Sequence, residues 1–246
     1  MRKFGLIGYP LKHSFSKKYF TEKFEKEGID DCQYELYELD TIDKFPELIK
    51  NNPELEGINV TIPYKEQVIP FLDSLEPGCK DIGAVNCIKI KKGKLTGYNT
   101  DYIGFKESLD KWLDGKRPQA LILGTGGASK AVKQALNDLE MPYLMVSRSD
   151  NGQKGLITYD HLIQNEKYLQ EHHLIINTTP LGTFPNTEEM PAIPLDQIGR
   201  EHKVYDLAYN PEKTFLMRSM EARGAVVKNG LEMLHLQAEA AWGIWN

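Results

Sequence analysis

The sequence predicts an α/β protein of two domains, one with a mixed sheet and one with a doubly wound parallel sheet. Short apolar runs alternate with amphipathic stretches along most of the chain. Two strand-like runs around Lys91–Lys94 resemble a hairpin, which would mix strand directions in the first sheet. Later in the chain, Leu121–Ser129 reads as a buried strand that breaks into a glycine turn and then a helix.

The first domain is predicted over residues 1–102. Phe4–Gly8 has the pattern of a buried strand, and after a polar loop Ser16 is the expected N-cap of an amphipathic helix over 17–28. The alternation then continues, with strands expected at 34–39, 57–61, 85–90 and 95–98 and helices at 42–50 and 65–75.

The second domain is predicted over residues 103–228. After a helix at 103–113 and the polar breaker Asp114–Pro118, we expect the strand and glycine turn at 120–129, helices at 130–139 and 213–223, and strands at 143–147, 174–177, 203–206 and 225–227. Residues 230–245 have the apolar spacing of a half-buried helix. We expect the segment 229–246 to return to the first domain and complete it.

Composition narrows the class of protein. The chain has 246 residues, 41% of them hydrophobic, which is enough for ordinary buried cores. A formal net charge of -5 argues against a nucleic-acid or anionic-membrane surface, because both need concentrated basic charge. Three scattered cysteines, no signal-peptide pattern and no apolar run of about 20 residues predict a soluble cytoplasmic protein with reduced thiols.

Two charged residues stand at predicted strand ends, where α/β proteins build ligand sites. Lys65 closes the segment Asn59–Lys65, and Asp101 closes the segment Gly97–Asp101. Together they can move a proton, and the glycine turn can receive a dinucleotide pyrophosphate, so the combination suggests hydride chemistry. Taken alone, Lys65 is more simply a solvated lysine in a helix's first turn, and Asp101 is as readily a helix N-cap before Ile103.

Seven motifs in order carry a resemblance to a known family. They are His13–Ser16, Asn59–Lys65, Gly83–Asn86, Asn99–Asp101, Gly124–Ser129, Tyr205–Pro211 and Gly230–Gln237. With these motifs the chain resembles the shikimate dehydrogenases, which reduce 3-dehydroshikimate to shikimate with a nicotinamide cofactor on the route to chorismate and the aromatic amino acids. The resemblance implies a substrate domain completed by the final helix, an inserted Rossmann-like cofactor domain, and an active site in a cleft between the two domains.

The resemblance also implies roles for single residues. Lys65 corresponds to the catalytic lysine and Asp101 to its partner. The substrate carboxylate and hydroxyl contacts correspond to Ser14, Ser16, Thr61 and Tyr209, and the ring-hydroxyl contacts to Asn59, Asn86 and Gln237. The alternative for each is local: serines before a helix are usually caps, and single amides usually belong to turns.

For the cofactor, the resemblance implies contacts from Gly124, Gly126, Gly127, Ala128, Ser129 and Gly230. Ser147, Arg148 and Ser149 follow the next predicted strand, where an arginine accommodates the 2′-phosphate of NADP and an acid would favour NAD. We therefore expect NADP. Gly152 stands where many relatives have a second basic residue, which weakens the preference, and Asp150 would oppose the phosphate if it turned inward.

The histidines suggest no metal site. His172 and His173 are adjacent before a predicted strand and would point to opposite faces, so they cannot chelate one ion together. His13 is expected to order its loop, and His235 has no assigned role. The predicted partner is a small-molecule substrate, with no nucleic acid or membrane, and the protein is expected to be a monomer or a homodimer.

Three alternatives remain open. The first is an NAD-dependent enzyme that acts on quinate as well as shikimate, and the Ser14-Phe15-Ser16 pattern favours shikimate. The second is a nucleotide-binding regulator that lost catalysis, against which the retention of Lys65 and Asp101 argues. The third is a dehydrogenase of similar two-domain build for a folate or an amino acid, which the substrate motifs disfavour.

Overall fold

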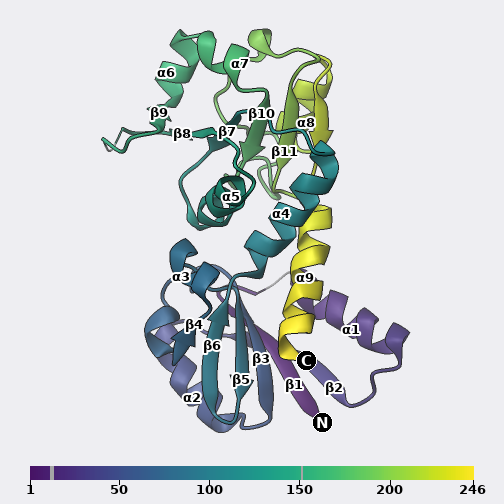
Figure 1. The fold of residues 1–246 in the computed structure, drawn as a ribbon. Coiled ribbons are helices and arrows are strands. Elements are labelled where there is room, and N and C mark those ends of the chain that lie inside the picture. Colours follow the sequence, from purple (N-terminus) through teal and green to yellow (C-terminus); the bar gives the residue numbers. More distant parts are fainter. Residues whose placement is uncertain (12–13, 151) are drawn as a thin grey trace. The chain divides into compact units, whose positions relative to one another are not determined.

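The computed structural model describes residues 1–11, 14–150 and 152–246 (Figure 1). The chain divides into two compact units, Met1–Asp101 with Gln237–Asn246, and Tyr102–Leu236. The sequence pattern places the return to the first domain at residue 229, earlier than the observed division after Leu236. The first turns of the last helix belong to the second unit, because Glu232 forms an ion pair with Lys111 there.

The first unit is built on a six-stranded sheet with the order β2-β1-β3-β5-β6-β4. Its strands are β1 (Arg2–Gly8), β2 (Cys32–Glu38), β3 (Leu55–Val60), β4 (Ser74–Leu75), β5 (Cys87–Lys91) and β6 (Lys94–Tyr98). β1 is parallel to β2 and β3, whereas β5 is antiparallel to both β3 and β6. The predicted mixed sheet is confirmed. The hairpin turns at Lys92 and Gly93, both with positive φ, as tight two-residue hairpin turns require.

Helices cover both faces of this sheet (Figure 1). They are α1 (Phe15–Glu27), α2 (Phe45–Asn51) and α3 (Pro77–Ile82), with α9 (Leu231–Trp245) entering the unit at Gln237. On one face Phe20 and Trp245 pack with β1 residues, and on the other Phe45 packs with Ile58 and Val60. α9 approaches closely because β3 has no side chain at Gly57, where a Cβ would lie 2.3 Å from Trp245 Nε1.

The second unit is built on an all-parallel sheet with the order β12-β11-β10-β7-β8-β9. Its strands are β7 (Ala120–Leu123), β8 (Tyr143–Ser147), β9 (Leu156–Thr158), β10 (Leu174–Asn177), β11 (Lys203–Asp206) and β12 (Val226–Lys228). β7, β8 and β9 follow one another in one direction, and β10, β11 and β12 in the other. The doubly wound, Rossmann-like sheet is confirmed, and its direction switches between β7 and β10.

The helices of this unit are α4 (Thr100–Leu113, which begins in the first unit), α5 (Gly127–Asp138), α6 (Tyr159–Gln164), α7 (Lys167–Glu171) and α8 (Phe215–Glu221). Alternate residues of β7 serve opposite faces, as the period of a strand requires. Ile122 packs with Phe105 and Val132 of α4 and α5, whereas Leu121 packs with Leu216 of α8. Both faces of the parallel sheet are therefore buried.

One predicted helix is wrong. Residues 65–75 form turns, a short 3-10 helix at Ile69–Phe71 and strand β4 in place of an α-helix. Pro70 provides the reason, because it lacks an N–H and disfavours the α conformation at the residue before it. Lys65 therefore does not lie in the first turn of an α-helix. The sequence pattern also does not predict α3, β9, α6 or α7, which are all short.

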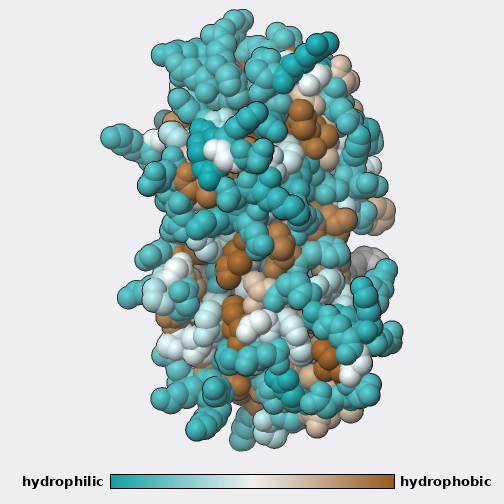
Figure 2. Space-filling view, turned by 45° about the vertical axis from the view of Figure 1, so that its right-hand side comes forward, coloured by the Kyte–Doolittle hydropathy of each residue, from teal (hydrophilic) through white to brown (hydrophobic). Residues whose placement is uncertain are grey.

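Hydrophilic residues cover most of the face drawn in Figure 2, and hydrophobic residues appear in scattered patches, as on most folded proteins. Among the described residues, no helix combines the length and the apolar character needed to span a bilayer.

Candidate active site

An ion pair in the first unit joins the two residues predicted to move a proton. Lys65 Nζ lies 2.6 Å from Asp101 Oδ2, and the side chains are 26% and 19% exposed. The backbone of Lys65 is held by Val85, whose N–H donates to the Lys65 carbonyl at 2.7 Å. Asp101 lies inside the first turn of α4 and is not its N-cap. The pair is thus both partly desolvated and accessible, as an acid–base pair must be.

A buried network of polar side chains fixes the start of α4 beside this pair. The Thr100 N–H donates to Asn86 Oδ1 at 2.5 Å, which satisfies one of the helix's first backbone donors. Asn86 Nδ2 donates in turn to Thr100 Oγ1 at 2.9 Å and to Gln237 Oε1 at 3.5 Å. Asn86, Gln237 and Thr100 are all buried. The structure therefore brings two predicted amides together around Thr100, which the sequence analysis does not identify.

A second part of this network runs through Tyr34, which the sequence analysis also misses. The Tyr34 hydroxyl donates to Asn59 Oδ1 at 2.7 Å, and Asn59 Nδ2 donates to the Asn86 carbonyl at 3.2 Å. Burial raises the pKa of Tyr34 well above its usual value, and a hydrogen bond with Ser16 opposes that rise. Tyr34 thus connects Ser16 to Asn59. The one signal for it in the sequence is a tyrosine at an inward position of a strand.

The two serines before and in α1 have different positions. Ser14 is the N-cap of α1 and accepts a hydrogen bond from the Lys17 N–H at 3.3 Å, whereas Ser16 lies in the first turn. The prediction that Ser16 is the cap is therefore wrong, because the helix begins at Phe15. His13 lies outside the described residues.

Thr61 follows directly after β3. Its N–H donates to the Ile7 carbonyl at 2.9 Å, which ties it to the end of β1. A Cβ at Gly8 would lie 2.4 Å from the Thr61 methyl group, so the two strand ends can approach only with glycine there. Thr61 is partly exposed.

The glycine turn in the second unit joins β7 to α5. Gly124 has φ +103, which disfavours any other residue, and Gly126 is the N-cap of α5. A Cβ at Gly126 or at Gly127 would meet open space. Ser129 is buried and its hydroxyl donates to the Gly126 carbonyl at 2.6 Å, while Ala128 lies in the first turn of α5. The backbone N–H groups at this helix start suit an anion such as a pyrophosphate.

The segment that follows β8 is exposed. Ser147 ends the strand and its hydroxyl accepts a hydrogen bond from the Ser149 N–H at 3.4 Å. Asp150 accepts a hydrogen bond from the Gly152 N–H at 2.8 Å, so its carboxylate is engaged with its own turn. Arg148 is exposed and forms no ion pair with any residue that the structure describes. Its guanidinium is therefore available to an anionic ligand at the end of the second strand of this sheet.

Tyr209 and Gly230 also lie in the second unit. Tyr209 is 39% exposed, and partial burial raises the pKa of its hydroxyl above the usual value. Gly230 donates its N–H to the Ala208 carbonyl at 3.0 Å. A Cβ there would lie 2.1 Å from the Leu207 carbonyl oxygen, so Gly230 is required for the close approach of the two segments.

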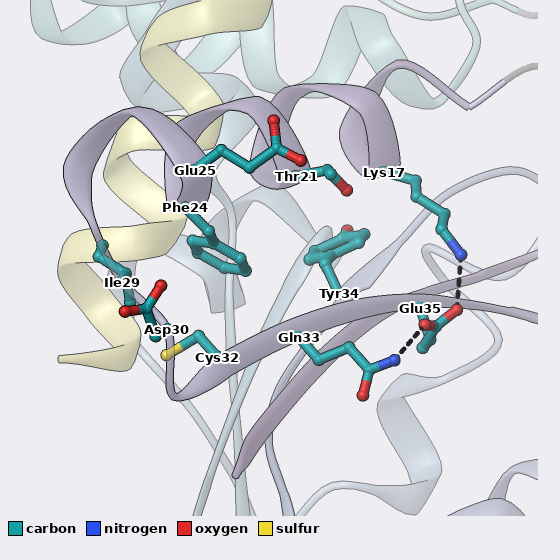
Figure 3. Close-up of a pocket in the computed structure, with 10 residues that line it drawn as sticks. All are labelled: Lys17, Thr21, Phe24, Glu25, Ile29, Asp30, Cys32, Gln33, Tyr34 and Glu35. Atoms are coloured by element: carbon teal, nitrogen blue, oxygen red, sulfur yellow. Dashed lines mark hydrogen bonds and ion pairs between the residues drawn. The ribbon is translucent and has the colours of Figure 1, made fainter.

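A pocket of about 340 Å3 lies between α1 and β2 in the first unit, and none of the predicted site residues lines it (Figure 3). Phe24 and Tyr34 face it from the helix and the strand, and Lys17 and Gln33 both reach toward Glu35. Among the described residues, no group of three or more histidines, cysteines or acids is arranged to hold a metal.

Comparison with known proteins gives the family. A model of the shikimate dehydrogenase substrate binding domain matches residues 6–88. The shikimate dehydrogenase (NADP(+)) of Clostridium botulinum is 37% identical over an alignment of 250 positions, which covers 98% of this chain and 95% of that protein. The chain belongs to the shikimate dehydrogenase family.

Solved structures agree with this membership. A chorismate mutase/shikimate 5-dehydrogenase fusion protein from Clostridium acetobutylicum is 34% identical, with a TM-score of 0.89 over 100% of this chain and 91% of that one. The shikimate 5-dehydrogenase of Thermus thermophilus, in complex with NADP(H) and shikimate, is 28% identical, with a TM-score of 0.85 over 100% and 94% of the two chains. Shikimate dehydrogenases thus share both of the α/β units described above.

Proposed function

We propose that the chain is an NADP-dependent shikimate dehydrogenase that reversibly reduces 3-dehydroshikimate to shikimate, on the route to chorismate and the aromatic amino acids. The observation that carries the proposal is the 2.6 Å ion pair between Lys65 and Asp101 in a chain of this family. The first unit would bind the substrate, and the family match to the substrate binding domain at residues 6–88 supports that assignment. The second unit would bind the cofactor.

Reduction of a ketone adds a hydride to carbon and a proton to oxygen. NADPH supplies the hydride when it is bound. Lys65 Nζ donates the proton to the ketone oxygen, and in the reverse direction it accepts the proton from the hydroxyl. Asp101 holds the ammonium group in place and accepts a hydrogen bond from a ring hydroxyl of the substrate.

The residues of the second unit fit a dinucleotide phosphate. The α5 N-terminus presents backbone N–H groups, and the open space at Gly126 and Gly127 leaves room for a pyrophosphate that a Cβ would fill. Arg148 has no acidic partner among the described residues and would pair with the 2′-phosphate. The hydrogen bond from the Gly152 N–H holds the Asp150 carboxylate within its own turn.

The polar side chains of the first unit would orient the acid. Ser14, Ser16 and Thr61 would bind its carboxylate and a hydroxyl, and Asn86 and Gln237 would bind ring hydroxyls. Asn59 is a weaker candidate, because both ends of its amide already bond to Tyr34 and Asn86. Neutral donors suit a carboxylate that is present in both substrate and product.

We also propose that the enzyme works in the cytoplasm, as a monomer or a homodimer. Cys32, Cys79 and Cys87 are all free thiols, which suits a reducing compartment.

Initial rates of nicotinamide reduction test the proposal, with shikimate and quinate each combined with NADP and NAD. Turnover mainly with shikimate and NADP is expected. Comparable activity with quinate or NAD would assign the broader enzyme, and no turnover from folded protein that binds nucleotide would assign a regulator.

A further inference from the structure

A buried carboxylate at the end of β11 has no part in the proposed chemistry. Asp206 is fully buried, and three donors surround it. Asn177 Nδ2 and the Ala208 N–H donate to Oδ1 at 3.0 and 3.1 Å, and the Thr214 hydroxyl donates to Oδ2 at 2.6 Å. Burial raises the pKa of Asp206, and these hydrogen bonds oppose the rise. Burying a carboxylate costs free energy, so its position here needs a structural or functional reason.

Asn177 passes the constraint from Asp206 to the turn after β10. Its Oδ1 accepts hydrogen bonds from the Thr179 N–H at 3.0 Å and from the Thr179 hydroxyl at 2.7 Å. Asn177 is itself fully buried. The orientation of its amide is therefore set by Asp206 on one side and sets the position of Thr179 on the other.

The turn after β10 lies directly against the glycine turn. The Thr178 N–H and hydroxyl both donate to the Leu123 carbonyl, at 3.0 and 2.8 Å. A Cβ at Gly124 would lie 2.9 Å from the Thr179 methyl group and 3.0 Å from the Thr178 hydroxyl. A shift of Thr179 would therefore disturb the glycine turn.

The topology of the sheet relates the contact between the two turns to ligand binding. The sheet changes direction between β7 and β10, and doubly wound sheets bind ligands in the crevice outside the carboxyl ends of the strands at that point. The glycine turn follows β7 and the turn Asn177–Thr179 follows β10, so both lie at the carboxyl ends of the two strands where the sheet changes direction.

We infer that Asp206 is a positioning residue for the nucleotide, which holds the turn Asn177–Thr179 against the glycine turn through the amide of Asn177. The inference rests on the proposed function, because it takes a dinucleotide as the occupant of the crevice. Asp206 touches no reacting atom in this scheme and acts only through the turn.

The test compares Asp206→Ala with two matched variants in the full chain. Asp206→Asn keeps an acceptor oxygen for Asn177 and Ala208 and turns its amide NH2 toward the Thr214 hydroxyl, which can accept. Thr214→Val removes the donor to Oδ2 and the N-cap of α8 but leaves Asn177 bonded. NADP affinity is measured by calorimetry, and amide hydrogen exchange is followed at Thr178 and Thr179 without nucleotide.

We expect Asp206→Ala to weaken NADP binding by about 10-fold, since it leaves buried donors unpaired, and to speed exchange at Thr178 and Thr179. Asp206→Asn should restore most of the affinity. Thr214→Val should lower the melting temperature without changing NADP affinity. If Asp206→Ala does not fold, Asn177→Ala provides the same comparison, because it breaks the link to Thr179 and leaves α8 capped.

Equal NADP affinity in wild type and Asp206→Ala, or equal weakening in Asp206→Ala and Thr214→Val, would overturn the inference. Wild-type protein that binds NADP but does not oxidise shikimate would contradict the proposed function and leave the inference intact. If the wild type bound no NADP, both the positioning role of Asp206 and the proposed cofactor would be wrong.

Discussion

The side chain of Asn86 caps helix α4 by accepting a hydrogen bond from the Thr100 N–H at 2.5 Å. Asn86 lies directly before β5, so a residue at the start of this strand fixes the first turn of α4. The residue after Thr100 is Asp101, whose carboxylate is paired with Lys65. The cap therefore controls the position of the acid–base pair as well as the stability of the helix.

Asn86→Ala should lower the free energy of unfolding by about 1–2 kcal/mol, because it removes a cap and leaves the buried Thr100 N–H without its acceptor. It should also lower kcat, since Asp101 loses its support. Thr100→Val keeps the N–H donor and should have a smaller effect on both. Urea unfolding and steady-state kinetics measure the two quantities, and a larger loss of kcat in Thr100→Val would contradict this role for the cap.

Lys65→Ala should lower kcat by about 10²–10⁴-fold with little change in substrate affinity, because it removes the proton donor and none of the carboxylate contacts. Lys18→Ala is the matched control, since Lys18 is 78% exposed in the same unit. Steady-state kinetics in both directions measure the effect. Near-normal turnover in Lys65→Ala would remove Lys65 from the mechanism.

Arg148→Ala should raise KM for NADP by about 10-fold and leave KM for NAD unchanged, because the guanidinium pairs only with the 2′-phosphate. The control is Arg117→Ala, since Arg117 already pairs with Asp110 at 2.7 Å. The ratio of kcat/KM for the two cofactors is the measured quantity. An equal change for NADP and NAD would show that Arg148 does not read the 2′-phosphate.

The sequence predicts the sheets better than the segments between them. The strands Tyr143–Ser147, Leu174–Asn177 and Lys203–Asp206 have the predicted bounds. The first two are continuous apolar runs that end at a polar residue, and the third has its apolar residues between Lys203 and Asp206. Residues 152–172 contain β9 and two short helices, α6 and α7. This segment has no clear apolar period, so no local pattern predicts these three elements. The error at 65–75 has a local cause, since the effect of Pro70 on the backbone outweighs the helical spacing around it.

Local sequence patterns likewise predict only part of the candidate site. Lys65 and Asp101 can be predicted because each closes a recognisable motif at a strand end. Tyr34 and Thr100 cannot, because their roles depend on hydrogen bonds to Asn59 and Asn86, which are distant in sequence. Gly57 is similar, since only the fold places Trp245 against it. Local sequence patterns here identify the reactive side chains. The tertiary contacts that orient these side chains leave no trace in such patterns.

Glu232, in the first turn of α9, provides a test of pH dependence. Hydrogen bonds from Lys111 at 2.8 Å and Lys228 at 2.5 Å lower the pKa of its carboxyl from 4.5 to about 2. A lowered acid pKa stabilises the folded state above the unfolded pKa. That contribution is lost as the pH falls from about 4.5 toward 2.

The Glu232 carboxylate is 31% exposed and Lys111 is 75% exposed, so solvent screening reduces the effect to about 1 kcal/mol. Glu232→Gln should therefore destabilise the protein by that amount at pH 6 and by progressively less below pH 4.5, measured by urea unfolding. Glu188→Gln, at an acid that is 74% exposed in the same unit, is the control and should change stability little at any pH. A loss of stability in Glu232→Gln that stays constant from pH 6 to pH 3 would mean that the side chain contributes by packing. A charge interaction would instead weaken over this range, because the carboxyl of the unfolded chain binds its proton at a higher pH than that of the folded protein.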